Sequence, residues 1–129
     1  MTGMSRPRVL LVDDEPGIRL GVRVYLEASG FDVLDATDCA SAMQLLYVRT
    51  FDVGVLDYAL PDGTALMVLA EIAKVQPAMK AIVLTAYPSD TLARTAIESG
   101  ATRFLTKPIE LAALRALLLE VTGAPDPAE

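Results

Sequence analysis

Apolar residues along this chain follow two alternating spacings, one typical of buried strands and the other of helices. Three largely apolar runs have the length of a strand and end at polar residues: 9–12, 51–56 and 81–84. Such runs are typical of parallel strands that are covered on both faces of a sheet. Weaker signals at residues 31–34 and 103–105 predict a second and a fifth strand.

The segments between these runs have the spacing of amphipathic helices. The predicted core-facing stripes are Ile18, Val22, Tyr25 and Leu26 in the first helix, and Leu111, Leu114, Leu118 and Val121 in the last. Pro16 suits the first turn of a helix, and Asp38 and Ser89 are suitable N-caps. Gly30 and Gly100 are suited to end helices, because glycine adopts the left-handed conformation that often follows the last turn.

Five strand–helix units in alternation predict an α/β fold with five helices around a doubly wound, five-stranded parallel sheet. We expect the flavodoxin-like strand order 2-1-3-4-5. The length of 129 residues suits one domain, which we place at residues 1–122. Residues 123–129 (Gly-Ala-Pro-Asp-Pro-Ala-Glu) have the composition of a tail or the start of a linker.

Composition excludes several classes of function. Although 53% of the residues are hydrophobic, no apolar run approaches the roughly 18 residues of a membrane span, and no signal peptide is evident. We therefore expect a soluble, cytoplasmic protein that does not associate with membranes. With no His and with Cys39 as its one cysteine, the chain lacks ligands for a zinc-type site. The net charge of −6 argues against direct binding of nucleic acid by this domain.

Five polar residues follow predicted strands at the edge where an open parallel sheet gathers its functional groups. They are Asp13, Asp14, Asp57, Thr85 and Lys107. Any one of them alone would more often be a helix cap, a turn residue or a solvated charge. Three carboxylates brought together repel one another unless a cation or protons neutralise them. Ligands that are all oxygen atoms indicate Mg²⁺ as that cation.

Four motifs make the chain resemble the receiver domains of two-component response regulators. They are Val-Asp-Asp-Glu-Pro (12–16), Leu-Asp-Tyr-Ala-Leu-Pro-Asp-Gly (56–63), Leu-Thr-Ala-Tyr (84–87) and Gly-Ala-Thr-Arg-Phe-Leu-Thr-Lys-Pro (100–108). The resemblance covers residues 9 to about 121. The order and spacing of the four motifs make it highly specific, whereas a lone Asp-Asp or Lys-Pro would mean little.

The resemblance implies a phosphorylation site. Asp57 would be the nucleophile that forms an acyl phosphate, with Lys107 contacting the phosphoryl oxygens. Asp14 would bind Mg²⁺ directly, Asp13 through water, and Ala59 through its backbone carbonyl. The family also implies a cis peptide bond before Pro108.

The resemblance further implies a switch. Thr85 would donate its hydroxyl to the phosphoryl group, and Phe104 would turn inward into the space that the hydroxyl leaves. The fourth helix, fifth strand and fifth helix would then shift between two arrangements that control a downstream output.

The same resemblance implies the partners of this domain, and apolar residues outside the core-facing stripes indicate where a partner docks. The family implies a sensor histidine kinase or a histidine phosphotransfer protein as phosphodonor, and allows a phosphorylation-dependent homodimer. Leu20 and Val24 on the first helix, with Leu117 and Leu119 on the fifth, are expected to form an apolar patch near which that partner docks.

Two alternatives from other classes remain open at this point. An aspartyl-phosphate phosphatase uses similar residues, but it carries Asp-x-Asp after the first strand and needs a cap domain. A flavodoxin-type flavin binder needs a Ser/Thr-rich phosphate loop where this chain has the acidic residues 13–15. We therefore expect a signalling switch that acts on no outside substrate, apart from its own phosphorylation and dephosphorylation.

Overall fold

The computed structural model describes residues 6–126 and contains a five-stranded parallel sheet in the order β2-β1-β3-β6-β7. The strands of this sheet are β1 (Arg8–Val12), β2 (Asp32–Ala36), β3 (Val53–Asp57), β6 (Lys80–Thr85) and β7 (Arg103–Thr106). Two-residue strands β4 (Ala59–Leu60) and β5 (Gly63–Thr64) form a small antiparallel hairpin after β3. Counting only the strands of the large sheet, the order is 2-1-3-4-5, which confirms the predicted fold class.

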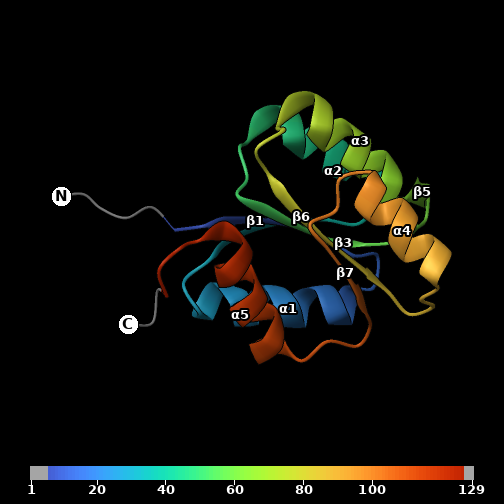
Figure 1. Cartoon of the computed structure of the whole chain (residues 1–129). Helices are drawn as coiled ribbons and strands as arrows, with labels where there is room; N and C mark the ends of the chain where they lie inside the picture. Colours follow the sequence, from blue (N-terminus) through green and yellow to red (C-terminus); the bar gives the residue numbers. More distant parts are fainter. Residues whose placement is uncertain (1–5, 127–129) are drawn as a thin grey trace.

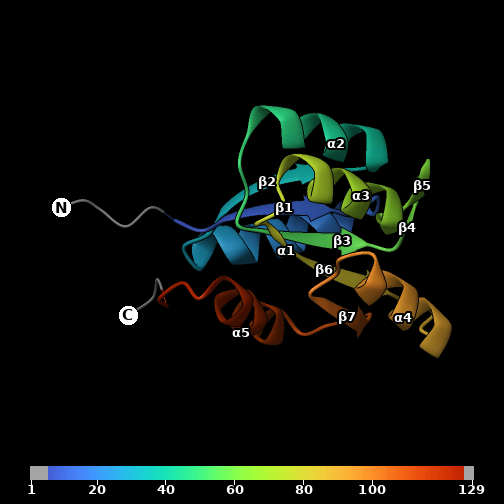
Figure 2. The ribbon, with the colours of Figure 1, turned by 45° about the horizontal axis from the view of Figure 1, so that its top comes forward.

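Helices cover both faces of the sheet, as Figures 1 and 2 show. They are α1 (Pro16–Ala28), α2 (Cys39–Val48), α3 (Ala65–Val75), α4 (Asp90–Glu98) and α5 (Leu111–Thr122). Helices α1 and α5 lie on one face, and α2, α3 and α4 on the other. Parts of the predicted domain (residues 1–5) and of the predicted tail (residues 127–129) lie outside the described residues.

The apolar strand runs are explained by burial on both faces. In β1, Val9 and Leu11 belong to the core under α1 and α5, while Leu10 and Val12 belong to the core under α2, α3 and α4. Successive side chains in a strand point to opposite faces. A strand between two helical layers therefore has no polar face, which is why the period-two alternation of a surface strand is missing.

The helix ends follow the predicted signals. The Asp38 carboxylate accepts a hydrogen bond from the Ser41 backbone N–H (2.8 Å), and the Ser89 hydroxyl accepts one from the Leu92 N–H (3.0 Å). Gly30 and Gly100, at φ of 100° and 111°, follow α1 and α4 in the left-handed region. The order of strands and helices is thus fixed by local signals that agree with the tertiary packing.

The exposure of some helix residues differs from what the spacing predicts. Ile18, predicted to face the core, is 40% exposed, because it borders an open cavity. Leu117 and Leu119, predicted to extend an apolar patch, are half-buried and pack against the core. The patch is therefore smaller than expected and centres on α1, where Leu20 and Val24 are 61% and 56% exposed.

Candidate functional site

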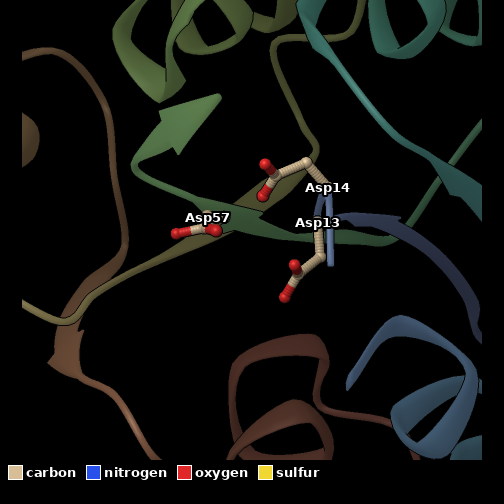
Figure 3. Close-up of side chains that lie close together, drawn as sticks. All are labelled: Asp13, Asp14 and Asp57. Carbon is tan, nitrogen blue, oxygen red and sulfur yellow. The ribbon is translucent and has the colours of Figure 1, made fainter. Parts of the chain in front are cut away.

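Three carboxylates meet at the carboxyl edge of the sheet. Asp13 and Asp14 directly follow β1, and Asp57 is the last residue of the neighbouring strand β3. Figure 3 shows Asp57 facing the pair across the strand ends. One oxygen from each carboxylate lies within 4.8 Å of the others. Two oxygens bound to one Mg²⁺ at about 2.1 Å lie up to about 4.2 Å apart, and a carboxylate that binds through water lies farther out, so this spacing fits a single cation.

Lys107 supplies a positive charge inside this acidic cluster. Its Nζ lies 3.2 Å from Asp57 Oδ2 and 3.5 Å from Asp13 Oδ2. The residue directly follows β7, and its backbone N–H donates to the Thr85 carbonyl at 2.8 Å. The peptide bond from Lys107 to Pro108 is cis. One lysine offsets one of three carboxylate charges, so the donor set fits a divalent cation.

Burial and charge set the ionisation of the site. Burial of the carboxyl group is the main cause that raises the pKa of Asp57, with smaller contributions from Asp13 and Asp14, while Lys107 works in the opposite direction. For Lys107, burial works against the charge, but attraction to Asp57 and Asp13 is stronger in sum and raises its pKa. Lys107 is therefore a cation at neutral pH, and Asp57 carries a charge that the fold disfavours.

Arg19 holds the loop that carries the acidic pair, a role that sequence reasoning missed. Its guanidinium donates to the Asp13 backbone carbonyl (2.9 Å) and pairs with Asp35, the fourth residue of β2 (3.4 Å). The Asp13 carboxylate in turn accepts from the Glu15 backbone N–H (2.9 Å). Arginine on an amphipathic helix normally indicates a solvated face, so the sequence contained no signal for this contact.

The hairpin after β3 begins at Ala59, two residues after Asp57. Ala59 is exposed and pairs with Thr64, and the Tyr58 N–H donates to the Leu84 carbonyl (2.8 Å). Asp62, at the tip of the hairpin, accepts hydrogen bonds from the backbone N–H groups of Cys39 (2.8 Å) and Ala40 (3.0 Å) at the start of α2. These bonds lower the pKa of Asp62. They tie the hairpin to the first turn of α2, although Asp62 lies 23 residues after Cys39 in the sequence.

Thr85 and Phe104 lie in different surroundings on neighbouring strands. Thr85 ends β6 one residue beyond Leu84, the register partner of Asp57. It is buried, and its hydroxyl oxygen accepts from the Tyr87 N–H (3.1 Å). Phe104 lies on β7 opposite Val83, half-buried against the core that includes Ala96 of α4. The fold therefore brings Thr85 to the edge of the site and leaves Phe104 in contact with the core beneath α4.

Comparison with known proteins identifies the family. The family model for the response regulator receiver domain matches residues 9–119. The chain belongs to this family. It is 38% identical over 115 residues to the response regulator protein PilR of Pseudomonas aeruginosa, covering 89% of this chain and 26% of PilR. The chain thus spans about a quarter of the length of that relative. The matches do not support the phosphatase alternative.

Solved structures agree with this assignment. A receiver domain protein from Methanospirillum hungatei has a TM-score of 0.89 at 27% identity, covering 92% of this chain and 95% of that one. A response regulator from Burkholderia pseudomallei, determined with a phosphorylated aspartic acid, a calcium ion and citrate, has a TM-score of 0.83 at 26% identity. The match covers 91% of this chain and 69% of that one.

Among residues 6–126, no helix is both long and apolar enough to cross a membrane.

Proposed function

We propose that this receiver domain is switched by phosphorylation of Asp57. The observation that carries the proposal is the position of Asp57 in a three-carboxylate cluster, with the Lys107 ammonium 3.2 Å from its Oδ2. The phosphorylated aspartic acid in the related protein from B. pseudomallei supports the same chemistry. Asp57 would attack phosphorus in line with the leaving group, since phosphoryl transfer depends mainly on positioning and charge stabilisation.

The surrounding residues have separate roles in this proposal. Asp14 would bind Mg²⁺ directly, Asp13 through water, and Ala59 through its carbonyl. When bound, the cation would offset charge between the carboxylates and the incoming phosphoryl group. Lys107 would hold the phosphoryl oxygens, and the Thr85 hydroxyl would donate to them. Phe104 would then follow Thr85 and shift the surface of α4, β7 and α5.

We infer that the phosphodonor is a sensor histidine kinase or a histidine phosphotransfer protein in the cytoplasm. Leu20 and Val24, exposed on the helix that follows Asp13 and Asp14, are the apolar residues that we expect it to contact. The domain would act on no outside substrate, and its output would be signalling. A homodimer formed on phosphorylation stays a prediction, which sedimentation with and without a phosphodonor tests.

Intact-mass analysis tests the phosphoacceptor. With Mg²⁺ and acetyl phosphate, the parent should gain one phosphoryl group, and Asp57→Asn should gain none. Asp52→Asn is the matched control, because Asp52 lies directly before the same strand at its opposite end. This control should label like the parent, and chelation of Mg²⁺ should prevent labelling in both. Undiminished uptake by Asp57→Asn would contradict the assignment.

A further inference from the structure

An open, largely apolar cavity of about 520 Å³ adjoins the proposed phosphoacceptor. Asp13, Asp57 and Lys107 contribute to its lining, and the rest is mostly apolar. The apolar wall comes from α1, α5 and the loop between β7 and α5: Ile18, Val22, Pro108, Ile109, Leu111 and Leu114. The cavity thus combines a nucleophile, a cation and a hydrocarbon surface, which is the usual composition of a small-molecule site.

Two glycines of α1 keep this cavity open. Gly17 and Gly21 both line it, one helical turn apart. A methyl group added to either would meet no atom of the described residues within 4 Å, apart from its chain neighbours and the backbone of its own helix. Glycine inside a helix is less favourable than alanine, because it loses more conformational freedom on folding. Within residues 6–126, no neighbouring side chain lies close enough to Gly21 to require glycine there. The same absence of side chains leaves Ile18 at the rim 40% exposed.

We propose that the cavity receives the hydrocarbon chain of a short-chain acyl phosphate, so that donors with three to six carbons phosphorylate Asp57 faster than acetyl phosphate does. This proposal rests on Asp57 being the phosphoacceptor. An Asp57 carboxylate oxygen would form the new bond to phosphorus, and the bond from phosphorus to the acyl oxygen would break. The leaving carboxylate keeps the electron pair, so no proton has to move.

The geometry favours an acyl chain over a more polar leaving group. Asp57 and Lys107 line the same cavity as the apolar residues of α1 and α5, so an acyl chain on the leaving oxygen has an apolar surface within reach. The rim also carries the acidic Glu15 in addition to Asp13 and Asp57, so a second anionic group on the donor would be repelled. A full burial of one methylene corresponds to about a fourfold gain in affinity.

The test compares second-order rates of Asp57 labelling by acetyl and butyryl phosphate in the presence of Mg²⁺. Butyryl phosphate adds two methylenes, so partial burial predicts a rate ratio of at least about five in the parent. Gly21→Leu should fill the cavity and bring the ratio close to one, and Gly21→Ala should lower it less. Ala28→Leu, at an exposed position in the last turn of the same helix and outside the cavity lining, is the control and should keep the parent ratio.

A second measurement detects binding in the cavity in the absence of metal and of phosphoryl transfer. Titration of the metal-free parent with butyramide, an uncharged probe, should shift the NMR signals of the Gly21 amide and of the Val22 and Leu114 methyls. Acetamide should shift them less, and the difference should vanish in Gly21→Leu. Two outcomes would overturn this inference without affecting the proposed function. The first is labelling of the parent by both donors at equal rates, and the second is a rate ratio that Gly21→Leu leaves unchanged. Failure of acetyl phosphate to label Asp57 at all would overturn the proposed function as well.

Discussion

Replacement of Asp57 by asparagine removes one of three neighbouring negative charges and keeps the size and shape of the side chain. The variant therefore measures what the acidic cluster does to the stability of the metal-free fold. Asp57 lies close to Asp13 and Asp14 in the native state but far from them in the unfolded chain. Their mutual repulsion consequently opposes folding.

The magnitude follows from the distances. At an effective dielectric constant of 20, two unit charges 4.8 Å apart, the upper limit within the cluster, repel by about 3.5 kcal/mol. The Lys107 ammonium, 3.2 Å from Asp57 Oδ2, attracts it by about 5 kcal/mol on the same scale. The attraction to Lys107 and the two repulsions from Asp13 and Asp14 thus largely offset one another, and burial of the Asp57 charge decides the sign. Removing that charge should stabilise the metal-free fold by about 1 kcal/mol, the equivalent of roughly one pKa unit.

The pH dependence has a definite sign. The pKa of Asp57 is raised in the folded state, chiefly by burial, whereas in the unfolded chain it should be near 3.9. Between these two pKa values the native state binds more protons than the unfolded state, so stability falls as pH rises through this window. Below the window Asp57 is neutral in both states. The advantage of Asp57→Asn over the parent should therefore be small in acid and reach its full size above the folded pKa.

Thermal melting at fixed ionic strength checks these expectations. At pH 7 without metal, Asp57→Asn should melt about 3–5 °C above its parent, from a stabilisation of about 1 kcal/mol. Glu98→Gln, at the end of α4, controls for net charge and should have a much smaller effect. Mg²⁺ should raise the melting temperature of the parent, and raise that of Asp14→Asn less. A metal-free Asp57→Asn that melts clearly below a parent insensitive to Mg²⁺ would refute the electrostatic argument.

Two other substitutions separate switching from folding. Thr85→Ala should still accept a phosphoryl group at Asp57 but show smaller phosphorylation-induced NMR shifts in α4, and shifts equal to those of the parent would contradict the coupling role. Gln76→Ala removes three hydrogen bonds of 2.6–2.9 Å that join the residue after α3 to the end of α2 and to Phe51. It should lower the free energy of unfolding by about 2 kcal/mol without changing phosphoryl uptake, and a loss of uptake at unchanged stability would be inconsistent with a purely structural role.

The large sheet was predictable because its strands are buried on both faces and therefore lack polar alternation. The site was predictable because parallel strands place their carboxyl ends at one edge. Asp13 and Asp57, 44 positions apart in the sequence, could thus be assigned to one cluster. The hairpin of β4 and β5 could not be predicted, since strands of two residues are too short to have a period. Its tie to α2 through Asp62 crosses 23 residues and leaves no local signal.

How deeply a helical side chain is buried was harder to predict than which face of the helix it lies on. The helical spacing correctly places Leu26, Leu114 and Leu118 in the core, where all are fully buried. The same spacing cannot show that Ile18 borders an open cavity, because that depends on how α5 and the β7–α5 loop pack against α1. Likewise, the sequence indicated repulsion among the three carboxylates, whereas burial contributes more to the raised pKa of Asp57. Burial is a property of the assembled fold.

The arrangement of the site suggests how one phosphoryl group could connect two distinct surfaces. The cavity and the exposed residues of α1 lie on the face of the sheet that α1 and α5 cover. Phe104 packs on the opposite face, against the core that includes Ala96 of α4. Asp57 and Thr85 lie where the strands end, between these two layers. A donor can therefore approach on one face while the packing change occurs on the other. The strand ends thus connect the proposed change at Asp57 to Phe104 and to the surface of α4, β7 and α5.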